Sequence, residues 1–226
     1  MKLSSDITTS APMKQKFLSQ FPHLKESSQL IPNPLLETFS GRRPRKMSSP
    51  FKFGVMGRLE KVKGVDAFLM AASHVCKSAP DAEFHIYGEG SQEEYLKIMA
   101  TRLDITKVFF HGYTIKPLSS MSQLDCLVVP SKEESFGLSA LEALSVGTPV
   151  IAFQETGIAD FLKHGKHGYL AQKGNCVVVI PNIEKNLLTP LTEAYQAVVW
   201  HFFTDNFDDF GAEQQQAYDN PNRTNT

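Results

Sequence analysis

The sequence predicts an α/β protein whose Rossmann-like parallel sheet is covered by helices on both faces. From residue 51 onwards, short apolar runs alternate with amphipathic segments, which is typical of a parallel sheet with crossover helices. Most of the runs are rich in Val, Ile or Phe, as expected of strands that are buried on both faces. In the segments between them, apolar residues recur three or four positions apart, which indicates helices.

The predicted elements follow one another as repeated βα units. Helical spacing covers residues 65–77, 92–103 and 136–146. Right-handed crossovers gather the loops that follow the strands along one edge of the sheet, where open α/β sheets bind ligands. The predicted strands are 51–56, 83–87, 107–110, 125–129 and 149–153. The loops to examine are therefore 57–64, 88–92, 111–117, 130–137 and 154–157.

Length and composition place this sheet within a longer globular chain. The 226 residues include 23 Lys and Arg and 24 Asp and Glu, so the net charge of −1 gives no reason to expect nucleic acid as a partner. A basic run at 41–46 fits a solvated linker or a contact with anionic lipid. We expect four parts: a connecting region over 1–47 with a helix near 13–21, a ligand-binding domain over 48–175, a helical extension over 176–204 and a disordered tail over 205–226.

The cysteines and the N-terminus indicate the compartment. Cys76, Cys126 and Cys176 lie fifty residues apart, with no Cys-x-x-Cys pair and no His at metal-site spacing, so we predict no metal site and a reducing environment. The first residues lack the apolar stretch of a signal peptide, and no run of about 18 apolar residues occurs. We expect a cytoplasmic protein, with peripheral contact at the inner face of a membrane left open.

The loop from Gly57 to Gly64 carries two cations that suit a diphosphate. Arg58 offers a fork for two phosphate oxygens, and Lys63 offers a point charge near the start of the next helix. Taken alone, the loop is better interpreted as two solvated surface cations, because Arg and Lys are common in turns.

The loop at 130–137 combines acidic and small residues with a helix start. Backbone N–H groups around Phe136 to Leu138 would face an anion. Glu134 can accept hydrogen bonds from sugar hydroxyls, and Glu142 could hold a vicinal diol such as a ribose. Two glutamates eight residues apart also fit a solvated helix face, but the apolar neighbours of Glu142 indicate a packed helix.

Two glycine turns would let the backbone approach a ligand closely. Gly88-Glu89-Gly90 lacks the third glycine of a dinucleotide fingerprint, so it gives little support to nicotinamide binding. In the turn that contains Gly112, His111 has no Ser, Cys or acid at recognisable spacing. We therefore interpret His111 as a structural or base-adjacent residue rather than as a catalytic base.

Five spaced motifs together resemble the nucleotide-sugar-binding domain of retaining GT-B glycosyltransferases, in the family called family four. The resemblance covers residues 48–175, and the Glu-x7-Glu pair after Pro-Ser is its most diagnostic part. The motifs are Gly57-Arg58-Leu59 with Lys63-Gly64, Tyr87-Gly88-Glu89-Gly90, Phe110-His111-Gly112-Tyr113, Pro130-Ser131 with Glu134-Ser135-Phe136-Gly137 and Glu142-Ala143, and Gly147-Thr148-Pro149-Val150.

The resemblance implies a fold, an activity and a set of site residues. The chain would be the C-terminal half of a GT-B enzyme that moves a sugar from a UDP-, GDP- or ADP-sugar to a glycan or lipid-linked acceptor, with retention of configuration and without a metal or cofactor. Arg58 and Lys63 would stabilise the leaving diphosphate, Glu134 would bind the donor sugar, and Glu142 would hold the ribose. Further donor contacts are implied for Gly57, Gly88, Gly90, Gly112, Ser135, Phe136, Gly137 and Leu138.

The sequence departs from the family in three places. Family members have an N-terminal Rossmann-like acceptor domain, and residues 1–47 resemble its end alone, so we expect the acceptor half to be missing or to come from another chain. The family's Gly-Gly and Glu after Gln154 are replaced by Thr156-Gly157 and Asp160, which could shift the donor-sugar preference. Beyond Asn175 the usual helical ending fades.

Three hypotheses for the function follow from these residues. The first is the donor-binding half of a retaining glycosyltransferase involved in polysaccharide synthesis. The second is a non-catalytic nucleotide-sugar-binding module, or a truncated fragment without turnover. The third, a nucleotide-sugar epimerase, is disfavoured by Glu134 and Glu142 in their Pro-Ser context. Because binding and turnover are separable, the sequence does not decide between the first two.

Overall fold

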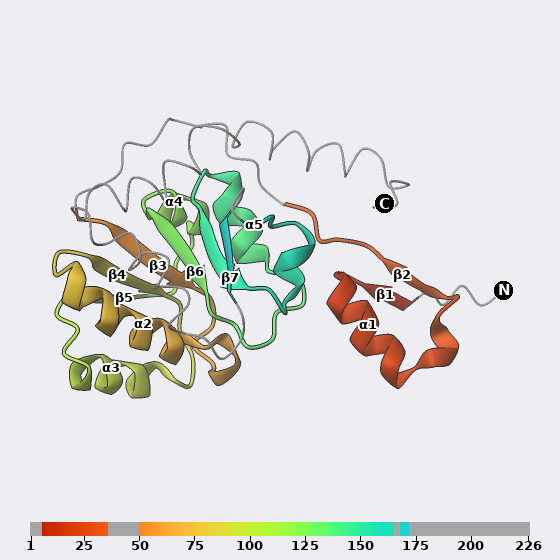
Figure 1. Ribbon diagram of the computed structural model, residues 1–226, viewed down its shortest axis with the longest axis horizontal. Coiled ribbons are helices and arrows are strands. Elements are labelled where there is room, and N and C mark those ends of the chain that lie inside the picture. The colour runs from red at the N-terminus through yellow and green to blue at the C-terminus, as the bar shows by residue number, and fades with distance from the viewer. Residues whose placement is uncertain (1–5, 36–49, 165–167, 172–226) are drawn as a thin grey trace.

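The computed structural model describes residues 6–35, 50–164 and 168–171. From residue 50 onwards the described residues form a six-stranded, wholly parallel sheet in the order β5-β4-β3-β6-β7-β8, with helices on both faces (Figure 1). This arrangement confirms the predicted fold class. The expected extension over 176–204 and the expected tail over 205–226 lie outside the described residues.

The strands of this sheet are short, and the five that the sequence predicts are all present. Their ends differ from the prediction by two residues at most. The strand β8 was not predicted, because a four-residue edge strand that begins with glycine lacks the Val and Ile pattern of the others. The strands are β3 (Lys52–Met56), β4 (Glu83–Tyr87), β5 (Val108–Gly112), β6 (Cys126–Val129), β7 (Val150–Phe153) and β8 (Gly168–Ala171).

The three predicted helices are also present, joined by shorter elements that the sequence did not predict. Gly137, at φ +92°, precedes the first residue of α5, so this helix begins two residues later than expected. The helices are α2 (Val65–Ser78), α3 (Glu93–Arg102), α4 (Pro117–Met121) and α5 (Leu138–Ser145). Single 3-10 turns occur at η2 (Lys61–Lys63) and η3 (Gly157–Asp160).

Strand β3 is the point at which the winding of the sheet reverses. Helices α2 and α3 pack on one face around Leu69, Phe84 and Leu96, whereas α4 and α5 pack on the other face around Leu127 and Leu144 (Figure 1). Right-handed crossovers that run away from β3 in opposite directions place their helices on opposite faces. A crevice therefore opens between the carboxyl ends of β3 and β6, and this is where such sheets bind ligands.

The N-terminal residues form a separate parallel βαβ unit. Strand β1 (Asp6–Thr8) pairs with β2 (Ser28–Leu30), and α1 (Ala11–Gln20) and the turn η1 (Pro22–Leu24) connect them. The sequence predicted the helix but neither strand, because three residues are too few to show a period of two. Helix α1 lies against η3 of the large sheet domain, so the unit is placed beside the loop after β6.

Candidate functional site

The loops after β3 and β6 pack backbone to backbone at the reversal point. The Lys132 amide donates a hydrogen bond to the Val62 carbonyl over 2.8 Å. Gly64 has a φ of +66°, and a Cβ atom at this position would lie 2.1 Å from the Pro130 carbonyl oxygen. The close approach of the two loops therefore depends on glycine at position 64.

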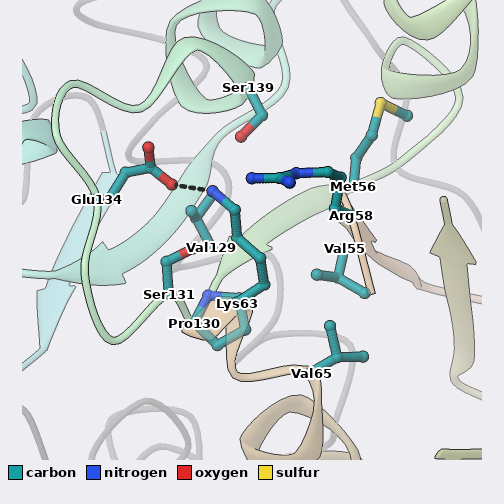
Figure 2. Close-up of a pocket in the computed structure, with 11 residues that line it drawn as sticks. Val55, Met56, Arg58, Lys63, Val65, Val129, Pro130, Ser131, Glu134 and Ser139 are labelled. Carbon is teal, nitrogen blue, oxygen red and sulfur yellow. Dashed lines mark hydrogen bonds and ion pairs between the residues drawn. The ribbon is translucent and has the colours of Figure 1, made fainter. Parts of the chain in front are cut away.

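Three charged side chains from these loops meet in one hollow (Figure 2). Lys63 Nζ lies 2.7 Å from Glu134 Oε2, with the two side chains 26% and 15% exposed. Arg58 extends into the same hollow, whose empty space of about 260 Å³ is open to solvent. The lining residues are Val55, Met56, Gly57, Arg58, Lys63, Val65, Val129, Pro130, Ser131, Glu134 and Ser139.

The N-termini of two helices add positive potential to the hollow. Val65, the first residue of α2, and Ser139, the second residue of α5, both line it. The N-cap residues are Gly64 and Gly137, and no side chain in the described part of the chain caps either helix. First-turn amides and the helix dipole favour an anion at such positions. The arrangement therefore suits phosphate groups.

Two of the predicted glycines bring the neighbouring loop into contact with the loop that carries Arg58. A Cβ atom at Gly88 would lie 1.9 Å from the Gly57 carbonyl oxygen, and one at Gly90 would lie 2.5 Å from the Leu59 carbonyl oxygen. Both glycines therefore allow the 88–90 turn to pack against the backbone of the loop that carries Arg58. Their direct contact with a donor stays a prediction.

An exposed brace also supports the Arg58 loop, and the sequence analysis missed it. The Glu60 carboxylate accepts hydrogen bonds from the Ser91 amide over 3.1 Å and from the Ser91 hydroxyl over 2.7 Å. These bonds, with a smaller effect of the Arg58 charge, hold the pKa of Glu60 below its usual value. Nothing in the spacing of these two residues, which come from different loops, would have indicated the contact.

Several predicted site residues lie outside the hollow. Phe136 is buried against Phe161, with a ring-centre distance of 5.2 Å. A Cβ atom at Gly137 would lie 2.3 Å from Ile158 Cγ1, so this glycine also makes room for a neighbour. Predicted residues that do not line the hollow are Gly88, Gly90, Gly112, Ser135, Phe136, Gly137, Leu138 and Glu142.

Glu142 lies one turn after the start of α5, on the accessible face of the helix. Leu138 is 40% exposed and Glu142 is half-buried, whereas the flanking residues Leu141 and Ala143 are buried. The structure thus places Glu142 in a packed helix, with its side chain on the accessible face. A ribose contact at this face stays a prediction.

Two serines line the hollow without having been predicted as site residues. Ser131, which is 2% exposed, follows β6 directly, and Ser139 lies in the first turn of α5. Ser139 could have been predicted from the sequence, because it comes two residues after Gly137, the N-cap residue of α5, and therefore lies in the first turn of the helix.

His111 belongs to a polar and aromatic cluster on β4 and β5. Its Nε2 lies 2.9 Å from His85 Nδ1, and the Tyr87 ring stacks on the His111 ring with a centre distance of 4.3 Å. Burial lowers the pKa of both histidines, and for His85 the hydrogen bond to Glu83 partly opposes this effect. His111 does not line the hollow.

Neither a metal centre nor a membrane span is found in the described residues. Within 6–35, 50–164 and 168–171, no three or more His, Cys, Asp or Glu side chains converge as metal ligands. Among the helices of these same segments, none has the length and apolar character needed to cross a membrane. The predicted absence of a cofactor stays a prediction.

Comparison with solved structures identifies the fold. A variant of Staphylococcus aureus TarM, in complex with Fondaparinux, alpha-GlcNAc-glycerol and UDP, gives a TM-score of 0.71 at 23% identity over 95% of this chain and 43% of that one. The C-terminal domain of the group 1 family protein LpcC from Francisella tularensis gives 0.61 at 22% identity, over 73% and 86%. The GtfA/B complex gives 0.64 at 20% identity, over 94% and 44%. The fold is that of the GT-B glycosyltransferases.

Sequence comparison identifies the family. The family model described as glycosyl transferases group 1 matches residues 39–195, and the chain belongs to this family, as predicted. The poly(ribitol-phosphate) alpha-N-acetylglucosaminyltransferase of Staphylococcus aureus is 32% identical over 134 residues, which are 58% of this chain and 27% of the relative. A glycogen synthase of Mycobacterium tuberculosis is 33% identical over 133 residues, 58% of this chain and 32% of the relative. The chain thus matches between about a quarter and a third of the length of these relatives.

Proposed function

We propose that this chain binds the nucleoside-diphosphate sugar of a retaining glycosyltransferase and supplies the donor half of its active site. The observation that carries the proposal is the pairing of Lys63 with Glu134, beside Arg58, in the hollow at the reversal point of the sheet. Membership of the glycosyl transferases group 1 family supports sugar transfer as the reaction.

The phosphate groups would bind to the positive side of the hollow. Arg58 suits two phosphate oxygens, Lys63 supplies a second cation, and the N-termini of α2 and α5 face the same space. When the bond between the anomeric carbon and the diphosphate oxygen breaks, its electron pair stays on the diphosphate. Donors already in position for that charge contribute about 3 kcal/mol each to stabilising the transition state.

The sugar would bind next to the diphosphate, on the Glu134 side. The carboxylate accepts hydrogen bonds from hydroxyl groups, and its contact with Lys63 over 2.7 Å places it beside the phosphate-binding cation. In a nucleotide sugar the anomeric carbon carries the diphosphate directly. A cation and a carboxylate that touch each other therefore match the two sides of the bond that breaks.

The acceptor half would come from a further domain, on this chain or on a partner. Strands β1 and β2 form a two-stranded parallel sheet, which needs further strands or helices for stability. Apolar side chains are exposed on the same unit, with Ile7 at 59%, Phe21 at 43% and Ile31 at 46%. The similarity to the GtfA/B complex supports a partner protein as one source of such a domain.

Calorimetric titration of the full chain with UDP, GDP, ADP and their glucose derivatives tests the proposal. We expect one nucleotide to bind saturably. The double variant Arg58→Ala/Lys63→Ala should lower the affinity for this nucleotide about a hundredfold, because two charge-assisted contacts are lost. The matched control, Lys97→Ala/Arg102→Ala, removes the same charges from α3. Equal losses in the two double variants, or no binding by the folded wild type, would refute the proposed site.

Turnover separates the catalytic hypothesis from the non-catalytic binding module. Release of the nucleoside diphosphate from the donor that binds best is measured with and without glycan and lipid-linked acceptors. Sugar transfer to an acceptor with retained configuration supports the enzyme. Tight donor binding without transfer, even when an acceptor domain is supplied, supports the module.

A further inference from the structure

The turn η3 connects the N-terminal βαβ unit with the loop that carries Glu134. We propose that η3 transmits shifts of helix α1 to the loop that carries Glu134. In this proposal Asp160, the last residue of η3, contacts α1 and is a positioning residue for Glu134. The inference deepens the proposed function, because Glu134 is the residue assigned there to the donor sugar.

The first link joins Asp160 to the start of α1. In the first turn of this helix, Pro12 has no N–H group, and the amides of Met13 and Lys14 donate to the side chain and carbonyl of Ser10. The remaining donor is the Ala11 amide, which lies 2.5 Å from Asp160 Oδ2. The first turn of α1 contains no acidic residue, so a carboxylate from 149 positions away supplies the negative charge that the helix dipole favours.

The second link joins the other end of η3 to the site. The Gly157 amide donates to the Glu134 carbonyl oxygen over 2.9 Å. A Cβ atom at Gly157 would lie 2.0 Å from the Ser135 carbonyl oxygen and 2.9 Å from Ser10 Cβ, and Ser10 itself is fully buried. Gly157 is therefore held between the cap of α1 and the backbone of the Glu134 loop.

The packing of η3 makes a rigid connection between these two links. Ile158 is fully buried, and a Cβ atom at Gly137 would lie 2.3 Å from its Cγ1 atom. Since close-packed groups transmit a displacement rather than absorb it, a shift of α1 moves the Glu134 backbone. The exposed ion pair between Lys16 and Glu133, 3.2 Å apart, spans the same boundary but is too solvated to fix it.

Replacement of Asp160 tests the coupling without touching Glu134. The variants are Asp160→Ala, which removes the acceptor, and Asp160→Asn, which keeps an acceptor oxygen but removes the charge. The matched control is Asp81→Ala, which removes a carboxylate bonded to Lys107 at the other end of the sheet. Thermal unfolding of all four proteins shows that each variant is folded.

The first measurement is hydrogen exchange of single backbone amides in the full chain without ligand. In Asp160→Ala we expect the Gly157 amide to exchange about threefold to fivefold faster, with a smaller change in Asp160→Asn. The Lys132 amide, bonded to Val62 within the sheet domain, should keep its rate and serves as the internal control. An unchanged Gly157 rate, or an equal change at Lys132, would overturn the coupling whether or not the protein binds a nucleotide sugar.

The second measurement compares the affinities for a nucleoside diphosphate and for its sugar derivative. In Asp160→Ala, displacement of Glu134 should weaken binding of the sugar derivative about threefold and leave the affinity for the nucleoside diphosphate unchanged. A merely structural defect would weaken both. If both ligands bind the variant as they bind the wild type, the positioning role is refuted while the proposed function stands. If the wild type binds neither ligand, the proposed function fails, and the exchange rates still decide the coupling.

Discussion

Replacing Gly64 with alanine should separate the two loops that form the site. The residue has a φ of +66°, which costs an L-residue about 1 kcal/mol. The new Cβ atom would lie 2.1 Å from the Pro130 carbonyl oxygen, so the loops must move apart by roughly 1 Å to reach ordinary contact. Overpacking of this kind costs about 1 to 3 kcal/mol. We therefore expect a total loss of about 2 to 4 kcal/mol in the free energy of unfolding.

Gly147 serves as a control that separates the cost of a positive φ from the cost of steric overlap. Gly147 also has a positive φ, +82°, but a Cβ atom there would have nothing within 4 Å. Urea denaturation should show that Gly147→Ala loses about 1 kcal/mol and Gly64→Ala clearly more. Calorimetry should show nucleotide affinity reduced about tenfold in Gly64→Ala, because a displacement of 1 Å misaligns Lys63 and Glu134. Equal losses of stability, with normal binding in both variants, would refute the reasoning.

Two further predictions concern charge. Glu134→Gln should raise the affinity for a nucleoside diphosphate about threefold, because the carboxylate beside Lys63 no longer repels phosphate, while the affinity for the sugar derivative should not rise in step. The same change in both affinities would contradict the role of Glu134. Burial lowers the pKa of His85 and His111. Below the usual value of 6.5, these two histidines therefore bind fewer protons in the folded chain than in the unfolded chain. The free energy of unfolding should fall as the pH drops from 6.5 through the lowered pKa values. Urea unfolding between about pH 7 and pH 5 measures this slope, which His111→Gln should flatten; an unflattened slope would show that the His85–His111 pair is not its source.

The regular elements of the sheet domain were predictable because their signals are local. The run 83–87 alternates residues that face the core around Phe84 and Ile86 with half-exposed ones, and the structure has β4 at those same residues. Strands β1 and β2 were missed because three residues are too few for a period to show, and β8 was missed because it lacks the Val and Ile pattern of the other strands. The start of α5 was placed two residues early because Gly137 takes a φ of +92° just before the first helical residue, at a site where a Cβ atom would lie 2.3 Å from Ile158 Cγ1, and no local pattern records this.

The residues of the hollow were predictable in part. Arg58, Lys63 and Glu134 belong to loops that the alternation of strands and helices places at one sheet edge, and the structure brings all three together. Ser139 was missed, and so was the brace between Glu60 and Ser91. Such contacts depend on how two loops are placed after the sheet has formed.

By itself, the sequence determined the fold class, the family and the loops that form the site, because periodicity and motif order are properties of neighbouring residues. The tertiary structure decided which residues of those loops touch. Lys63 and Glu134 are 71 positions apart, and Ala11 and Asp160 are 149 positions apart. Whether such pairs meet within 3 Å depends on backbone packing at glycines such as Gly64, where the missing Cβ atom lets two loops approach. The distances within these two pairs depend on the packing of the whole chain, so they cannot be predicted from any one segment of the sequence.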